Sequence, residues 1–166
     1  MQIISGNTTP TEGEIHYEQN GARIEDGEIF RQIAIAAPYL ELLEEFTLDE
    51  MIRFHFQFKK IIGGIKIEQI SQLMGLENAS AKQIRQFSSG MKQRVKLGLT
   101  ILSDVPVLLL DEPASNLDHK AIDWYNDLIK QYSSNRIVIV CSNQQKNEFE
   151  FCGKNINIED HKGVKI

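Results

Sequence analysis

The sequence predicts an α/β fold in which helices cover a mostly parallel sheet. Three short apolar runs, Ile33–Ala37, Pro106–Leu110 and Arg136–Cys141, have the length and continuous hydrophobicity of strands buried on both faces. Helical segments lie between them, and this strand–helix–strand order favours one parallel sheet. The 166 residues are 42% hydrophobic and 25% charged, which is ordinary globular composition.

The N-terminal part is expected to hold one short strand before the first buried one. Residues Gly13–Tyr17 follow Pro10 and precede the turn pair Asn20-Gly21, so they are predicted as a strand between turns. The run Ile33–Ala37 then ends at Pro38, as a buried strand does.

The segment after Pro38 is expected to be almost purely helical. Phenylalanines at positions 54, 56 and 58 alternate with polar residues as in a strand, but Thr47–Glu50 matches a capping box, so we favour a helix. Two shorter helices are expected over Ile67–Met74 and Ser80–Gln86, the second with another capping-box match at Ser80 and Gln83.

The second half is expected to alternate helices and strands. A helix runs from about Met91 to Ser103, and Asp118 is placed to cap the next one. Two short strands are expected near the C-terminus, at Asn155–Ile158 and Val164–Ile166. The apolar face of the helix after Asp118 comprises Ala121, Trp124, Tyr125, Leu128, Ile129 and Tyr132.

Composition excludes several classes of protein. The net charge of −5 disfavours a dedicated nucleic-acid binder, which needs a basic surface. Apolar runs such as Val105–Leu110 are far shorter than the roughly 20 residues of a membrane-spanning helix. Two cysteines, Cys141 and Cys152, do not form a disulfide framework and are expected to be reduced thiols.

The strongest chemical feature is an acidic pair after a buried strand. Val107–Leu110 leads into Asp111-Glu112-Pro113, which delivers two carboxylates to the C-terminal edge of the sheet, where ligands bind in open α/β folds. One carboxylate could hold magnesium while the other faces an attacking water. The alternative interpretation is a simple turn after the strand.

Two further motifs flank helices. Ser88-Ser89-Gly90 opens the helix that begins near Met91, where free N–H groups and the helix dipole favour an anion; the alternative is a plain serine N-cap. The stretch from Ser115 to Asp118 follows the acidic pair directly; the alternative is a loop with an aspartate cap.

In this order and spacing the motifs resemble the nucleotide-binding domain of ABC transporters. Ser88–Arg94 is similar to the signature motif, Leu108–Pro113 to the Walker B strand with its catalytic glutamate, and Ser115–Asp118 to the D-loop. Ile3–Gly6 and the residues up to Ile15 look like the segment that follows the P-loop helix, so the resemblance covers nearly the whole chain.

The resemblance implies a P-loop NTPase-like fold and an ATP-hydrolysing transport motor. Residues 1–37 and 89–166 would form the core subdomain, and residues 38–88 an inserted helical subdomain that meets the membrane subunit. A second ABC ATP-binding domain would pair head to tail with this one around two ATP molecules. An integral membrane permease subunit is the other implied partner, with no nucleic acid, and the location is cytoplasmic and peripheral at the inner face of the cell membrane.

The resemblance also implies individual roles. Asp111 would hold Mg²⁺ and Glu112 would polarise the water that attacks the γ-phosphate of ATP, with Asn143 in the position of the switch residue. Phosphoryl transfer needs such positioning more than covalent work by the protein. The residues expected to contact nucleotide held by the opposite domain are Ser88, Ser89, Gly90 and Met91. The D-loop residues expected at the dimer interface are Ser115, Asn116, Leu117 and Asp118.

Three departures from the family pattern qualify this interpretation. The glycine-rich motif G-x-x-x-x-G-K-[ST] is absent, because Gly153-Lys154 is followed by Asn155 and Glu148 stands where the first glycine belongs. The resemblance therefore implies a domain truncated at its N-terminus after the P-loop, whose N-terminal strands are missing. Met1 would be either an internal methionine taken as a start or the product of a broken gene.

The other two departures concern the loops after the first and last buried strands. Pro38-Tyr39-Leu40-Glu41 follows the first strand without the family's glutamine, and Asn143 replaces the switch histidine. An asparagine can donate a hydrogen bond to phosphate or water but cannot carry a proton. These departures motivate an alternative, a degenerate non-catalytic regulatory or adaptor domain, which the presence of Glu112 disfavours. A soluble ABC protein acting on DNA or ribosomes ranks last, because the chain shows no coiled-coil insertion or tandem domain.

Overall fold

The computed structural model describes residues 1–143 and 148–161, and a parallel sheet lies at its centre. In this part of the chain the sheet has three strands, β3 (Ile33–Ala36), β4 (Val107–Asp111) and β5 (Ile137–Cys141), with β4 in the middle. Both neighbours run parallel to β4, which confirms the predicted α/β class.

The register of the sheet brings the ends of the strands to one edge. Leu110 pairs with Ala36 on one side, and Asp111 pairs with Cys141 on the other. The residues of β4 between Val107 and Asp111 are completely buried, which explains why this strand is a continuous apolar run. The acidic pair after Leu110 therefore emerges at the carboxyl edge of the sheet.

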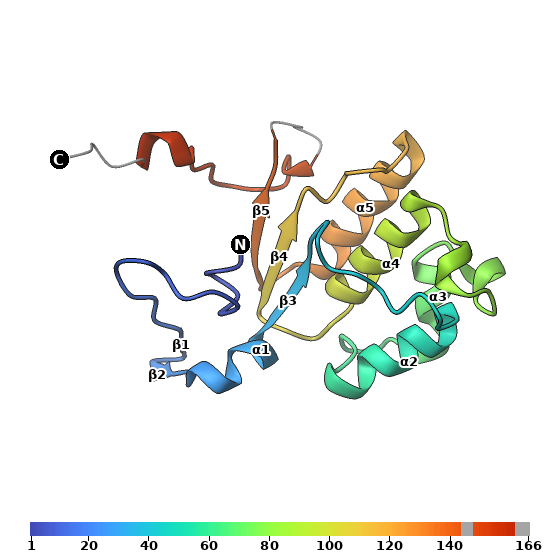
Figure 1. Cartoon of the computed structure of the whole chain (residues 1–166), viewed down its shortest axis with the longest axis horizontal. Helices are drawn as coiled ribbons and strands as arrows, with labels where there is room; N and C mark the ends of the chain where they lie inside the picture. Colours follow the sequence, from blue (N-terminus) through green and yellow to red (C-terminus); the bar gives the residue numbers. More distant parts are fainter. Residues whose placement is uncertain (144–147, 162–166) are drawn as a thin grey trace.

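Two helices cover one face of the sheet. Helices α4 (Ser89–Ile101) and α5 (His119–Tyr132) lie side by side on this face, as Figure 1 shows. Tyr125 and Ile129 of α5 are fully buried in the main hydrophobic cluster, together with Val95 of α4. The helical face predicted for residues 121–132 is thus confirmed as the packing face.

The other face carries a smaller cluster. Ile29, Ile33 and Leu109 form its buried centre, and residues of the N-terminal segment, including Ile4 and Tyr17, pack against it. This segment continues into helix α1 (Ile29–Gln32), which leads directly into β3. The N-terminal part thus packs on the side of the sheet opposite α4 and α5 (Figure 1).

The segment between β3 and α4 is helical, as expected. Its α-helices are α2 (Leu48–Phe58) and α3 (Ile70–Leu73), and its 3₁₀ turns are η2 (Ile67–Gln69), η3 (Glu77–Ala79) and η4 (Ile84–Gln86). Buried side chains from this segment belong to the same hydrophobic cluster as α4 and α5. Its treatment as a separate subdomain stays a prediction.

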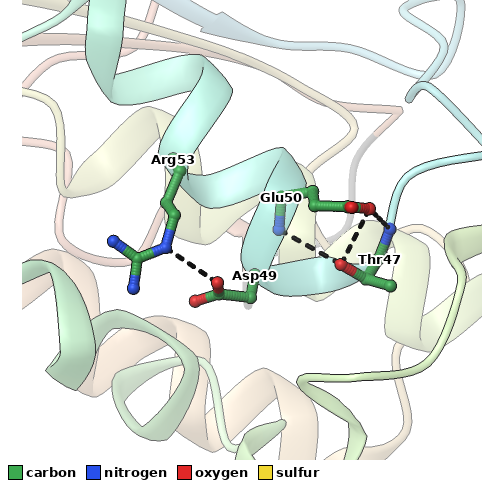
Figure 2. A network of polar contacts seen from close by, with 4 residues as sticks. All are labelled: Thr47, Asp49, Glu50 and Arg53. Atoms are coloured by element: carbon green, nitrogen blue, oxygen red, sulfur yellow. Dashed lines mark hydrogen bonds and ion pairs between the residues drawn. The ribbon is translucent and has the colours of Figure 1, made fainter.

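Helix α2 begins at the predicted capping box (Figure 2). The Glu50 N–H donates to the Thr47 hydroxyl at 3.2 Å, and the Glu50 carboxylate accepts from the Thr47 N–H at 2.8 Å. Arg53 donates to Asp49 at 2.8 Å one turn further along. These hydrogen bonds satisfy N–H groups at the start of the helix, which favours the helix over the alternative strand in this segment.

The strand expected at Gly13–Tyr17 is wrong. The chain instead forms a small antiparallel hairpin just after it, from β1 (Glu18–Gln19) and β2 (Ala22–Arg23). Asn20 and Gly21 have φ angles of 53° and 78°, the left-handed conformation that a tight hairpin turn requires. The turn residues were recognised, but the turn joins the strands of a hairpin instead of ending one strand.

Two other expected elements are also wrong. Ser80–Gln86 is helical only in η4, because Gln83 forms a bridge with Thr47 and its side-chain amide donates to the carbonyl of Glu45 instead of capping Ser80. Asn155–Ile158 is not a strand, and Ile158 begins the 3₁₀ turn η6 (Ile158–His161). The strand expected at Val164–Ile166 lies outside the described residues.

Strand β5 was expected to be buried on both faces, and this is only partly right. Its ends are exposed and its middle is half-buried, and among the described residues no strand pairs with its outer edge. Ile137 is 62% exposed there. In residues 1–143 and 148–161, none of the helices has both the length and the hydrophobicity needed to cross a membrane.

Candidate functional site

The acidic pair and Asn143 meet at the carboxyl edge of the sheet. Asp111 is the last residue of β4, and the N–H of Glu112 donates to the carbonyl of Cys141 at 2.8 Å. The side-chain amide of Asn143, two residues beyond β5, donates to the Glu112 carboxylate. The end of β5 and the residue two positions beyond it thus hold Glu112 by its backbone and by its side chain.

The backbone of Glu112 adopts a conformation that is uncommon outside glycine. Its φ angle is 45°, in the left-handed region, which costs about 1–3 kcal/mol for a residue with a side chain. The turn is closed by the Ser115 N–H, which donates to the Glu112 carbonyl at 3.0 Å. Such strain persists only where the surroundings over-determine it, and it concentrates at functional sites.

Tyr39 lies near Asp111 at the same edge. Burial raises the pKa of the Tyr39 phenol, and the Asp111 carboxylate raises it further. Burial and the Asp111 carboxylate likewise raise the pKa of the Cys141 thiol. The segment after β3 therefore reaches the acidic edge through Tyr39, although it has no glutamine.

The residues present are compatible with Mg²⁺ in the mode it adopts with nucleotides. The described part of the chain holds no group of three or more His, Cys, Asp or Glu residues that could bind a metal by themselves. Mg²⁺ commonly takes only one or two protein carboxylates and completes its shell with water and substrate phosphates. Asp111, half-buried at the strand end, is a donor of that kind.

The start of α4 is an exposed helix N-terminus. Ser88 is its N-cap, because its hydroxyl accepts from the Met91 N–H at 3.2 Å. Ser88 and Ser89 are both exposed. The first-turn N–H groups of a helix lack intrahelical partners and carry partial positive charge, so this end suits an anion.

The loop predicted as the D-loop, Ser115–Asp118, packs directly on this helix end. A Cβ placed on Gly90 would lie 2.9 Å from the backbone carbonyl oxygen of Asn116, so only glycine allows this approach. Asn116 itself has a φ of 63°. The loop ends where the Asp118 carboxylate accepts from the Ala121 N–H at 2.8 Å and caps α5. The predicted cap is therefore confirmed, and the signature and D-loop segments form one contact surface.

Two side chains of α4 that sequence reasoning missed connect this surface to the strands. The buried amide of Gln93 donates to the carbonyl of Pro113 at 3.0 Å. The Lys96 ammonium donates to the carbonyls of Ala37 and Pro38, at 3.4 and 3.2 Å, and burial lowers its pKa. A cavity of about 160 Å³ lies here, lined by Pro38, Lys92, Gln93, Lys96, Ser115 and Asn116 among others.

The structure thus joins four of the predicted residues in two contacts. Glu112 meets Asn143, and Gly90 meets Asn116. Across the described residues, Ser88 and Met91 make no hydrogen bond to either member of the first pair. Leu117 is partly buried against the main cluster, and its N–H donates to the carbonyl of Ala114.

Comparisons with known proteins identify the family and the fold that this chain shares. A family model described as "ABC transporter" matches residues 1–115. The chain is 26% identical over 149 residues to the uncharacterized ABC transporter ATP-binding protein YybJ of Bacillus subtilis, covering 89% of this chain and 67% of YybJ.

Solved structures show the same fold. One titled as the ATP-binding subunit of an ABC transporter has a TM-score of 0.68 and 28% identity, over 84% of this chain and 60% of the other. The cassette MJ0796, solved as a dimer bound to ADP and Pi, has a TM-score of 0.72 and 21% identity, over 89% of this chain and 69% of that one. The chain thus spans about two thirds of the length of these proteins.

Proposed function

The chain belongs to the ABC transporter family, and we propose that it is an ATP-binding part of a motor that couples ATP hydrolysis to transport through a separate membrane subunit. The observation that carries this proposal is the contact between Asn143 and Glu112 beside Asp111, at the carboxyl edge of a parallel sheet. An adaptor domain would have no use for a strained, doubly held carboxylate at this position.

Glu112 is proposed to act on the attacking water. A carboxylate with a fixed position can accept a hydrogen bond from a water and orient it for attack on the γ-phosphate. The Asn143 amide donates to this carboxylate, which restrains its orientation, and cannot itself take up a proton. The backbone bond from Glu112 to Cys141 fixes the depth of the acid relative to the sheet.

Asp111 is proposed to hold Mg²⁺. When bound, the ion neutralises charge on the phosphates of ATP. Asp111 ends the central strand and pairs with Cys141 of β5, so the sheet fixes the backbone of the residue that carries this carboxylate. We infer that this rigidity aligns the metal ligand with Glu112, the next residue along the chain.

The signature and D-loop residues are proposed to serve a second nucleotide site. The exposed first turn of α4, with Ser88, Ser89, Gly90 and Met91, would contact the γ-phosphate of ATP held by an opposite ABC domain. The D-loop from Ser115 to Asp118 would lie at the interface between the two domains. The close approach of Gly90 to the Asn116 carbonyl supports this, because it packs the two motifs against each other.

The second ABC domain and an integral membrane permease subunit are the partners, and the location is the cytoplasmic face of the cell membrane. The 166 residues contain no G-x-x-x-x-G-K-[ST] loop, so the chain by itself is proposed to be inactive.

ATP turnover by the assembled transporter distinguishes a motor from an adaptor. We expect the complex that contains these 166 residues to hydrolyse MgATP and to do so faster when transport substrate is supplied. An assembled complex whose turnover does not depend on residues of this domain would instead support the regulatory or adaptor alternative.

A further inference from the structure

A buried glutamate lies behind the acidic turn, and no motif accounts for it. Glu148 is 1% exposed, although it follows β5 by only seven residues. One carboxylate oxygen accepts from the Ala114 N–H at 2.9 Å. A buried carboxylate is costly unless it is hydrogen-bonded, so its presence here needs a reason.

The contact links two segments of the site. Ala114 lies between the Glu112-Pro113 pair and the D-loop, and it is 4% exposed. Glu148 belongs to the segment after β5 that also carries Asn143. Two residues of this segment therefore contact the acidic turn. The Asn143 amide donates to the Glu112 carboxylate, and the Glu148 carboxylate accepts from the backbone N–H of Ala114.

Glu148 is itself held by α5. The Tyr125 hydroxyl donates to the backbone carbonyl of Glu148 at 3.0 Å, and Tyr125 is completely buried. Its ring also makes an edge contact with Phe151, at 6.1 Å between centroids. The backbone of Glu148 is thus anchored to a helix of the core while its side chain reaches the turn.

The turn needs such support because its own residues do not close it alone. The N–H of Glu112 donates a hydrogen bond to β5, and the carbonyl of Pro113 accepts one from Gln93 of α4. The N–H of Ala114 donates a hydrogen bond to Glu148. Each partner comes from a different element. Without Glu148, the buried Ala114 N–H would lose its acceptor. The turn that keeps Glu112 in its left-handed conformation would then have one hydrogen bond fewer to hold it.

We propose that Glu148 is a positioning residue that fixes the turn carrying Glu112 and couples it to the segment after β5. The consequence for catalysis rests on the proposed function, whereas the positioning itself does not.

Amide hydrogen exchange of the chain tests the positioning without any nucleotide. Glu148→Met removes the acceptor at similar length, and Glu148→Gln keeps it. We expect the Ala114 amide to exchange roughly 10- to 100-fold faster in the Met variant, the loss typical of a buried hydrogen bond, and to stay protected in the Gln variant. The amides of Leu97–Ile101 in α4 should keep their rates, and Glu150→Gln, two residues away and exposed, is the matched control.

Two results would overturn the proposal. One is an unchanged Ala114 exchange rate in Glu148→Met, and the other is an equal acceleration at Ala114 and along α4, which would make Glu148 a general stabiliser of the fold. If the Met variant does not fold, Glu148→Asp keeps the charge and shortens the reach, and an unchanged rate at Ala114 there overturns the proposal equally.

The catalytic consequence has its own measurement in the assembled complex. We expect Glu148→Met to lower kcat for MgATP about tenfold with KM unchanged, and Glu148→Gln to restore it, since the Gln side chain still accepts from Ala114. A parallel rise in KM, or no rescue by Gln, contradicts the catalytic role. A wild-type complex that does not hydrolyse ATP would contradict the proposed function. The exchange rates would still test whether Glu148 holds the Ala114 N–H.

Discussion

Glu112 is the residue on which the site depends, because three features constrain it at once. Its φ is left-handed, its N–H is bonded to β5, and its carboxylate is bonded to Asn143. The sequence alone indicated an acid at a strand end but left a plain turn as an alternative. The contact with Asn143 favours the functional interpretation, and it could not be predicted because it joins residues 31 positions apart.

Asn143 should matter through its hydrogen bond to Glu112. Asn143→Ala removes the donor, and the free energy of a hydrogen bond to a charged group corresponds to a rate change of roughly 10- to 100-fold. We expect that decrease in the kcat of the assembled ATPase. Asn143→Asp has the same shape but places a second carboxylate against the first, so it should lower kcat further. Equal turnover in the wild type and both variants would remove Asn143 from the mechanism.

His55 should make the fold sensitive to acid. Burial, together with the smaller effect of the neighbouring Lys59, lowers its pKa from 6.5 to about 4, and its ring nitrogen lies 2.9 Å from the Ser103 hydroxyl. The unfolded chain therefore takes up the proton first as pH falls from 6.5 to 4, and the folded state loses up to about 3 kcal/mol in that window. Above pH 6.5 this stability is fully present.

Urea unfolding at several pH values measures this effect. We expect the free energy of unfolding of the wild type to fall more steeply between pH 6.5 and 4.5 than that of His55→Gln. The variant His16→Gln, at an exposed histidine, should keep the wild-type slope. If His55→Gln also keeps the wild-type slope, the buried neutral histidine is not the cause.

At the scale of elements, the hydrophobic pattern and the capping residues predicted those helices and strands whose formation depends on nearby residues in the sequence. The strands β3, β4 and β5 and the helices α2, α4 and α5 were expected near their observed positions. The failures occurred where a distant partner decides, as at Gln83, whose bridge to Thr47 overrides its capping-box match. They also occurred where strands are short and exposed, as in the hairpin of β1 and β2, which lacks an apolar signal.

The same limit applies to the site. Motif order indicated Asp111, Glu112 and the signature and D-loop residues. Nothing in the sequence indicated that Lys96 would reach the end of β3 or that Glu148 would be buried against Ala114. A lysine in an amphipathic helix and a glutamate in a polar segment are usually solvent-exposed, so these contacts emerge only from tertiary packing.

The contact between α4 and the D-loop should be sensitive to one methyl group. Gly90→Ala places a Cβ 2.9 Å from the Asn116 carbonyl oxygen, and overpacking of this kind costs about 1–3 kcal/mol. Helix propensity favours alanine by up to about 1 kcal/mol, so we expect a net destabilisation of about 1–2 kcal/mol in urea unfolding.

Gly63→Ala is the matched control for this change. No atom lies within 4 Å of a Cβ built at Gly63 among the described residues, so its effect should stay within about 0.5 kcal/mol. Equal effects of the two substitutions would mean that the D-loop moves away from α4 freely.

For the whole molecule, the nucleotide cradle is the part that these residues do not supply. The carboxyl edge of the sheet presents Asp111 and Glu112, whose negative charges repel phosphate, and the chain holds no glycine-rich loop to offset them. Among the described residues no strand pairs with the outer edge of β5, where Ile137 is exposed, and an unpaired edge of this kind favours association.

Isothermal titration of the isolated 166-residue chain with MgATP tests this statement. We expect no binding with micromolar affinity, because the chain that holds the acids has no glycine-rich loop to surround the phosphates. Micromolar affinity would show that another part of these 166 residues replaces the glycine-rich loop.

The central claim is that Glu112 acts on the water that attacks ATP, and one comparison tests it most directly. In the assembled transporter, Glu112→Gln keeps the size and hydrogen-bonding shape of the side chain but removes its charge. We expect kcat for MgATP to fall by about 10²–10⁴-fold while MgATP binding is retained, with Glu150→Gln unchanged as the control. Unaltered turnover in Glu112→Gln would contradict the claim.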